Sequence, residues 1–310
     1  MCNQSSQLSN GHFSGTLHNN EANRERGGSG FNPLSHIYCP EQNLFHDDAV
    51  GLNFEHAMNG TAKDADICMF TPRLDHCSIL RHTDSSACIV HNARDSSWNM
   101  DSKMSYTFSG EHYVDLVFKV TPREDRFPLG YVAFMWASYM NRAVDRRIHF
   151  WGYDGNKEGW ATFGENIEDG FETGTIAYRD LDPLPYEAGT KTLNIIEHPT
   201  KKFVLPFYYG LTHGSECDDS HDITMVYVMI FDQKESIRFA MWNFIKNAEG
   251  VPDTHSPAWD WQYAIRKPQI DKEYGYRARV IYKAFAGRDD VKAEYENWIN
   301  VIDNENHLCT

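Results

Sequence analysis

The chain has 310 residues, a formal net charge of -15 and 14% aromatic residues, with 18 Phe, 16 Tyr and 8 Trp. Its negative field repels phosphate backbones and anionic surfaces, which excludes nucleic acid as a partner. No apolar run approaches the ~20 residues of a membrane span, and the aromatic excess is typical of an all-β protein with a ring-lined core or cleft.

The first 30 residues are rich in Asn, Ser, Gly and His and show almost no apolar periodicity. This composition predicts a flexible polar leader over residues 1–30. From about Gly51 onward, turn residues separate short apolar runs, with no internal repeat and no low-complexity linker. We therefore predict a single domain over residues 31–310.

Seven cysteines are scattered along the chain, and none forms a CxxC pair. This spacing argues against a zinc ribbon and against a dense disulfide framework. The default expectation is a cytoplasmic protein. The alternative is a periplasmic or lipid-anchored protein, in which a signal ending at Cys2 has been removed.

An early cluster of candidate residues lies in GLNFEHAMNG, where Glu55 and His56 are adjacent. In a regular strand they would face opposite ways, whereas in a loop both could reach one site. A Glu or His at such a site is a candidate general acid or base. Arg73, in FTPR, is a candidate anchor for a carboxylate, although each of these residues has an ordinary structural explanation as well.

Period-two alternation dominates the rest of the chain. In HYVDLVFKVTP one face receives Val114, Leu116, Phe118 and Val120. The same alternation predicts strands in GYVAFMWASYM, RRIHFWG, KFVLPFYYG, ITMVYVMIFD, SIRFAMWNF, PAWDWQYAI and YGYRARVIYKAF. Gly, Pro, Asn and Asp clusters separate these runs. The pattern predicts an all-β fold, a two-layer antiparallel β-sandwich of the supersandwich or jelly-roll type.

Several predicted strands carry polar or ring side chains opposite their apolar face. In SPAWDWQYAI, Trp259 and Trp261 are expected in the core, with Asp260 and Gln262 on the other face. If the strands belong to one curved sheet, a concave sugar-binding surface would also receive Arg147, His149, Trp151, Arg238, Trp242, Arg277 and Arg279. The alternative is that the arginines pair with acidic neighbours, that His149 is structural and that the tryptophans fill the core.

The segment HGSECDDSHD, residues 213–222, holds two His and four carboxylates, which could bind a divalent cation such as Ca²⁺. It matches no established calcium or zinc spacing, so a solvated loop is the favoured interpretation. We assign no metal ligands and no certain cofactor. Near the C-terminus, a pattern typical of an amphipathic helix covering the sandwich has Asp289 as its cap, Asp290 in its first turn and one apolar face of Val291, Tyr295, Trp298 and Ile302.

Six stretches resemble an uncharacterised group of bacterial β-sandwich proteins found in organisms that degrade polysaccharides. They are GLNFEHAMNG, YVDLVFKVTP, GYVAFMWASYM, PFYYG, PAWDWQY and EYGYRARVIYKAF. The resemblance implies a fold similar to carbohydrate-active sandwiches, including galactose-mutarotase-like supersandwiches. Mutarotase-like enzymes use a His and a carboxylate at the anomeric centre, and the candidates by residue type are Glu55, His56, His149 and Asp260.

The leading hypothesis is a carbohydrate-active enzyme, a lyase, glycosidase or epimerase, acting on an oligosaccharide in a concave cleft. The arginines suit a uronate, because guanidinium binds carboxylate bidentately. A glycosidase needs two carboxylates, for which Glu55 and Asp260 are the candidate pair. Substrate-binding candidates are Arg73, Trp151, Arg238, Trp242, Gln262, Arg277 and Arg279. The alternatives are a non-catalytic carbohydrate-binding or surface protein and a structural protein without a ligand, and the sequence leaves the oligomeric state open.

Overall fold

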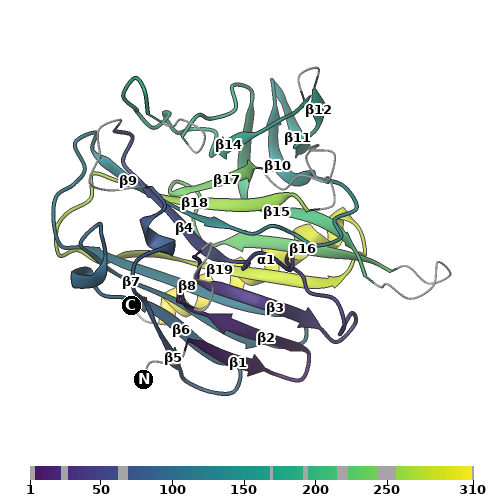
Figure 1. The fold of residues 1–310 in the computed structure, drawn as a ribbon. Coiled ribbons are helices and arrows are strands. Elements are labelled where there is room, and N and C mark those ends of the chain that lie inside the picture. Colours follow the sequence, from purple (N-terminus) through teal and green to yellow (C-terminus); the bar gives the residue numbers. More distant parts are fainter. Residues whose placement is uncertain are drawn as a thin grey trace.

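The computed structural model describes residues 4–21, 27–61, 69–167, 170–190, 195–214, 223–242 and 256–308. In these residues, one layer is an antiparallel sheet of nine strands in the order β11-β10-β15-β16-β19-β8-β7-β6-β5 (Figure 1). Its strands are β5 (Ser78–Arg81), β6 (Ser86–His91), β7 (Met100–Ser109), β8 (Tyr113–Pro122), β10 (Ile148–Asp154), β11 (Lys157–Phe163), β15 (Lys201–His213), β16 (Thr224–Phe231) and β19 (Tyr274–Ala284).

The opposite layer consists, within the described residues, of a five-stranded sheet and a three-stranded sheet. The five-stranded sheet has the order β14 (Gly174–Ala177), β17 (Ile237–Trp242), β18 (Ala258–Arg266), β9 (Tyr131–Ala137) and β4 (Asn53–Met58). The three-stranded sheet is β1 (Ser5–Ser9), β2 (Phe13–His18) and β3 (Gly30–His36). Short elements complete the fold, namely η1 (Thr71–Arg73), η2 (Ala93–Asp95), β12 (Asn166–Ile167) and β13 (Gly170–Phe171). The predicted two-layer antiparallel sandwich is confirmed.

Aromatic rings fill the space between the layers. Trp136 of β9 stacks on Trp261 of β18 with ring centroids 5.5 Å apart, and Phe54 of β4 stacks on Trp136 at 5.0 Å. The predicted core faces of β8 and β18 are buried as expected. Because strand side chains alternate, the residues between these rings project from the outer faces of the sheets. That alternation positions the candidate site.

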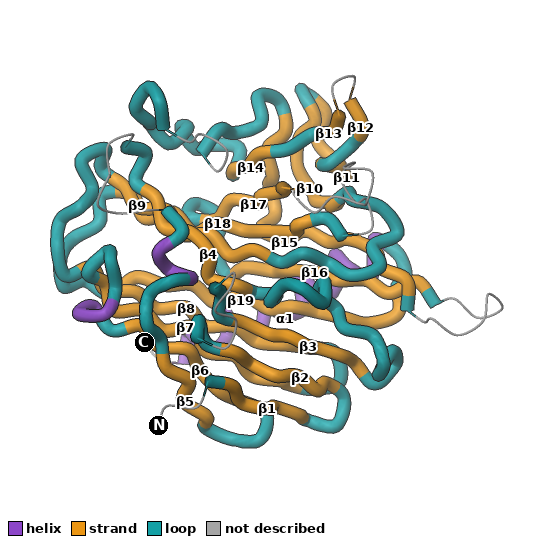
Figure 2. Tube along the Cα trace, viewed as in Figure 1, coloured by secondary structure: helices purple, strands orange, loops and turns teal. Residues whose placement is uncertain are grey.

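The C-terminal helix α1 (Arg288–Leu308) covers the outer face of the nine-stranded sheet, as Figures 1 and 2 show. Val291, Trp298 and Ile302 of α1 pack with Phe207 and Ile281 of that sheet. The predicted amphipathic helix is therefore confirmed. It begins at Arg288, so Asp289 lies in its first turn rather than at its cap. No helix in the described ranges is both long and apolar enough to cross a membrane.

The prediction of a flexible leader is wrong where the structure describes it. Strands β1 and β2 pair in antiparallel register, and β2 pairs with β3. Phe13 and Leu17 are buried, and Phe13 packs on Phe108 of the nine-stranded sheet with ring centroids 5.6 Å apart. Only two apolar residues mark the inner face of β2, with Gly15 between them, so its alternation is hard to see. Residues 1–3 and 22–26 lie outside the described residues.

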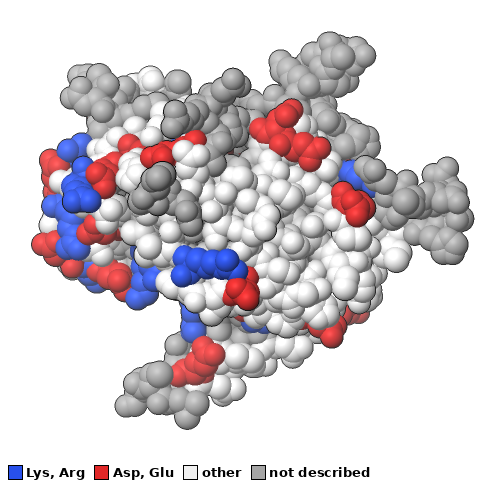
Figure 3. Space-filling view, turned by 60° about the horizontal axis from the view of Figure 1, so that its bottom comes forward, with Lys and Arg blue, Asp and Glu red and all other residues white. Residues whose placement is uncertain are grey.

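Cys39, Cys77 and Cys88 are buried. The other four cysteines, Cys2 among them, lie outside the described residues. On the face that Figure 3 displays, Lys and Arg lie among Asp and Glu at one side, and a wide area carries neither. The negative net charge is therefore not gathered into one acidic patch on that face.

Candidate functional site

A β-bulge in β4 brings two candidate residues to one side of the five-stranded sheet. Phe54 pairs with Trp136 and His56 pairs with the next residue, Met135, so Glu55 is an extra residue in the ladder. Phe54 points into the core, while Glu55 Oε1 lies 3.9 Å from His56 Nε2. From the sequence, we expected Glu55 and His56 to reach one site only if they lay in a loop. The bulge brings them together within a strand.

Arg73 joins this pair from η1. Its Nη1 donates to Glu55 Oε1 at 2.7 Å, and its guanidinium lies 4.6 Å from the ring centroid of Phe70. The ring of Phe70 also meets the ring of His56 edge-on, with centroids 4.4 Å apart. Glu55, His56 and Arg73 therefore form one cluster, which we call the Glu55 cluster.

Burial controls the protonation of the groups around Glu55. Burial, and second the charge of Arg73, lower the pKa of His56 to about 3, so its ring is neutral at neutral pH. Asp260 of β18 is fully buried and accepts a 2.9 Å hydrogen bond from the backbone N–H of Ser138. Burial raises the pKa of Asp260 well above its usual range, and the charge of Glu55 raises it further. Asp260 is thus a buried carboxyl group near enough to Glu55 for their charges to interact.

A small recess of about 10 Å³, the room that one water molecule needs, lies beside Glu55, and of the Glu55 cluster Glu55 is the residue that lines it. Asn53, Ala137 and Tyr139 line it together with Gly27 and Val50. Gly27 has a φ of 69°, and a Cβ there would lie 2.7 Å from the carbonyl oxygen of Arg73. A glycine is therefore required where this segment passes η1. Gly27, Asn53 and Tyr139 were not among the predicted site residues. Of the three, Gly27 alone had a signal in the sequence, namely its place in the glycine-rich run RGGSG, residues 26–30.

Arg238 and Gln262 lie on the same outer face, but in a closed environment. Arg238 Nη1 donates to Gln262 Oε1 at 2.8 Å, and Nη2 donates to Thr175 Oγ1 at 2.9 Å. Nη2 also donates to the carbonyl oxygen of Ile195 at 2.7 Å and pairs with Glu197 at 3.2 Å. Burial lowers the pKa of Arg238 to about 10. These contacts hold residues 195–197 on the sheet. Trp242, also buried, lies on this face with Ala240 and Ala258.

The remaining candidates lie on the other side of the molecule. His149, Trp151, Arg277 and Arg279, like Arg147 before β10, belong to the nine-stranded sheet or its edges and not to the five-stranded one. The convergence of all candidate strands on one curved sheet is therefore wrong. Alternation fixes which side chains share a face of one strand, but it does not say which sheet the strand joins.

On that side, each candidate has structural partners. His149 stacks on Tyr209 with centroids 4.7 Å apart, and Trp151 meets Trp160 edge-on at 5.7 Å. Arg279 donates to both oxygens of Asp115, at 2.7 and 3.1 Å. The remaining pairs are those of Arg277 with Glu305 and Asp232 and of Arg147 with Asp145. These contacts fit the alternative given for these residues, in which the arginines pair with acidic neighbours and the rings have packing roles.

The predicted cation-binding segment lies mostly outside the described residues, which end at residue 214 and resume at residue 223. In the part of the chain that the structure describes, no group of three or more His, Cys, Asp or Glu could hold a metal ion. The Ca²⁺ hypothesis stays a prediction.

No protein-family model matches the chain, and no curated protein matches it. Similar solved structures include a galactose mutarotase-like protein from Lactobacillus casei, with a TM-score of 0.48 and 8% identity over 90% of this chain and 100% of that one. They also include the GalM/aldose epimerase homologue from C. elegans, with a TM-score of 0.47 and 11% identity over 90% of this chain and 99% of that one. These similarities assign no activity and no residue to this chain.

The Glu55 cluster has the parts of an acid–base site. It offers a carboxylate, a neutral imidazole and a guanidinium within one contact network beside a recess. Glu55 is 9% exposed, whereas Asp260 is 1% exposed. Of these two carboxyl groups, Glu55 is therefore the more accessible, and it is the one that lines the recess.

Proposed function

We propose that the protein is a carbohydrate-active enzyme that uses the Glu55 cluster for acid–base chemistry on an aldose. The observation that carries the proposal is the bulge in β4, which puts the Glu55 carboxylate 3.9 Å from the neutral imidazole of His56 on one side of the sheet. A bulge that re-aims side chains is a common device beside active sites. Acid–base catalysis first requires that the catalytic group lie within hydrogen-bonding distance of the proton that it transfers.

Interconversion of anomers is the reaction that these groups suit best. Glu55 would take the proton of the anomeric hydroxyl as the bond between C1 and the ring oxygen breaks and C1 becomes a carbonyl. The N–H of the neutral His56 would hold the ring oxygen as it gains charge, and Glu55 would return the proton to it. Rotation about C1–C2 and reversal of these steps give the other anomer. No atom is gained or lost.

The structure gives less support to a glycosidase or to an enzyme acting on uronates. A glycosidase needs two carboxylates that flank the scissile bond, but Asp260 is buried and bound to Ser138. The uronate hypothesis depended on several arginines. Among the candidate arginines in the described residues, only Arg73 lies in the Glu55 cluster, and it already pairs with Glu55. Epimerase chemistry on a neutral sugar is therefore the favoured form of the proposal.

The test is the rate of anomer interconversion of freshly dissolved aldoses, followed by polarimetry, with binding followed separately by thermal shift. We expect acceleration by the wild type and a loss of about 10²- to 10⁴-fold in kcat for Glu55→Gln, the usual contribution of a general base. Glu158→Gln is the matched control, because Glu158 lies on β11 and accepts from Tyr153 and Trp151.

Two results would contradict the proposal. An unchanged rate for Glu55→Gln would remove the Glu55 cluster from the chemistry. If the protein binds a neutral or uronate sugar but does not accelerate anomer interconversion of any sugar tested, it is a non-catalytic binding protein instead.

A further inference from the structure

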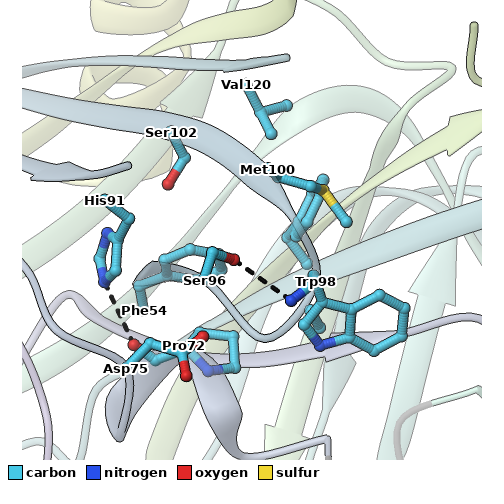
Figure 4. Close-up of a pocket in the computed structure, with 11 residues that line it drawn as sticks. Phe54, Pro72, Asp75, His91, Ser96, Trp98, Met100, Ser102 and Val120 are labelled. Atoms are coloured by element: carbon cyan, nitrogen blue, oxygen red, sulfur yellow. Dashed lines mark hydrogen bonds between the residues drawn. The ribbon is translucent and has the colours of Figure 1, made fainter. Parts of the chain in front are cut away.

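The turn that carries Arg73 is held from its buried side by the opposite layer of the sandwich. The carbonyl oxygen of Pro72 accepts a hydrogen bond from His91 Nε2 at 3.2 Å and another from Asn20 Nδ2 at 2.9 Å. His91 is the last residue of β6, in the nine-stranded sheet. Figure 4 shows its ring pointing at Pro72, with the hydrogen bond drawn as a dashed line.

The same ring also contacts β4. His91 meets Phe54 edge-on, with centroids 5.6 Å apart and planes at 88°. Phe54 directly precedes Glu55, and Pro72 directly precedes Arg73. One buried imidazole therefore touches the neighbour of each partner in the 2.7 Å ion pair between Arg73 and Glu55.

The chemistry of this contact specifies the state of His91. A carbonyl oxygen can only accept, so the contact requires the tautomer with its hydrogen on Nε2. His91 is fully buried, and burial lowers its pKa to about 4, so the ring is neutral at neutral pH. The neighbouring carboxyl of Asp75 is bound to the backbone N–H and hydroxyl of Ser97.

The surroundings of His91 are mostly apolar. A small cavity of about 20 Å³ beside the ring is lined by apolar side chains, Met100 and Phe134 among them, and also by Ser102 and Trp98. Among the described side chains, His91 and Asn20 are the ones that donate to the carbonyl oxygen of Pro72. If the donor at His91 is removed, the hydrogen bond from Asn20 remains on that carbonyl oxygen.

We propose that His91 is a positioning residue that holds η1 against β4, so that Arg73 meets Glu55 in the orientation the Glu55 cluster requires. The expected effect of His91 on turnover rests on the proposed function, whereas its expected effect on the position of Arg73 is independent of that function.

Three substitutions separate positioning from general stability. His91→Gln keeps an amide N–H at the same number of bonds from Cβ as Nε2, whereas His91→Asn is one bond shorter and His91→Leu has no donor. Met100→Leu, in the wall of the same cavity, is the matched control. Each variant is first checked for folding by its thermal melting curve.

The first readout is the set of side-chain N–H signals of Arg73 in ¹⁵N NMR spectra, assigned with Arg73→Lys. We expect these signals, sharpened by the ion pair, to broaden or shift in His91→Leu and His91→Asn and to be retained in His91→Gln and Met100→Leu. The second readout is kcat for anomer interconversion. It should fall about 100-fold in His91→Leu, the usual cost of a misplaced catalytic group, with KM changed less than about 3-fold.

The outcomes distinguish the two proposals. If the Arg73 signals change as expected but no variant or wild type accelerates interconversion, positioning stands and the proposed function fails. If the Arg73 signals of folded His91→Leu match those of the wild type, the positioning role is overturned. Equal losses of kcat and of the Arg73 signals in His91→Gln and His91→Leu would also overturn it, because the donor would not matter.

Discussion

On the outer face of the nine-stranded sheet, Arg279 donates to both oxygens of Asp115 and lies over the rings of Tyr113 and Trp298. On the outer face of the five-stranded sheet, Arg73 donates to one oxygen of Glu55 beside a neutral His56. Both arginine side chains are 20% exposed. The exposed fraction therefore does not distinguish an arginine that packs against a helix from one at a candidate active site. The residues that surround each arginine do distinguish them.

The surroundings of the two carboxylates differ. Asp115 accepts from Arg279 through both oxygens, and α1 lies across the pair. Glu55 accepts from Arg73, contacts the neutral His56 and lines a small recess. The first arrangement stabilises the packing of a helix, and the second is compatible with proton transfer. The following predictions test this difference.

The largest effect is expected from the same change at both arginines. Arg73→Met should lower kcat for anomer interconversion about 100-fold, because the Glu55 cluster loses its cation. Arg279→Met should leave kcat unchanged and lower the free energy of unfolding by about 1 kcal/mol, the scale of a partly exposed pair. Kinetic assays and urea denaturation measure the two effects. A similar loss of kcat in both variants would remove the distinction between the faces.

The next effect concerns the pH dependence of stability around Asp260. Because burial raises its pKa, the native protein keeps a proton that the unfolded chain loses above about pH 4. Asp260 therefore lowers the free energy of unfolding as the pH rises toward its native pKa, by up to about 1.4 kcal/mol per pH unit. Asp260→Asn removes this loss.

Urea denaturation of both proteins at several pH values between about 5 and 9 tests the effect of Asp260. The variant should gain stability relative to the wild type with rising pH. Parallel curves would mean that Asp260 is ionised in the native protein at these pH values.

A smaller effect of opposite sign is expected at His149, on the other face. Burial, followed by the charge of Arg288, lowers its pKa to about 4, so protonation destabilises the native state as the pH falls from about 6.5 toward 4. His149→Phe should retain about 2 kcal/mol more of its neutral-pH stability at the acidic end of this range.

Denaturation midpoints at acidic and neutral pH measure the effect of His149, and kcat at neutral pH is the control. We expect kcat to stay at the wild-type value, since His149 stacks on Tyr209 and lies on the sheet opposite Glu55. A loss of turnover would return His149 to the catalytic candidates.

The smallest effect is expected for Trp151→Leu. Trp151 is half-buried against Trp160, and the Lys292 ammonium of α1 lies 4.9 Å from its ring centroid. These contacts indicate packing rather than stacking on a sugar, so KM for any accepted sugar should change less than about 2-fold. Sugar titration of the variant is the measurement. A marked rise in KM would indicate a binding surface on this side.

Local alternation in the sequence predicted much of the fold. The apolar face of β8 and the rings of β18 are buried as expected, and Val291, Trp298 and Ile302 form the buried stripe of α1. Alternation and helical periodicity are properties of one element, so one sequence contains them. The leader was predicted wrongly because β2 has only Phe13 and Leu17 to mark its inner face. Its order comes from pairing with β3, which is not local.

The candidate site was harder to predict, because it depends on relations between elements. Asp260 and Gln262 do lie opposite the core rings of their strand, but buried contacts surround them. The sequence could not show that Arg238 and Arg279 lie on different sheets. Nor could it show that a bulge aligns Glu55 with His56, because a bulge appears only in the register between two strands.

The bulge in β4 also makes the length of this segment a constraint beside its residue types. Only Phe54 and Glu55 lie between Asn53 and His56. Loss of the Glu55 codon would restore regular pairing with β9 and leave the core ring of Phe54 in place, but it would remove the carboxylate. Loss of the Phe54 codon would restore the pairing as well, but it would place Glu55 at the core-facing position opposite Trp136. The proposed chemistry therefore needs the extra residue in the ladder as well as its carboxylate.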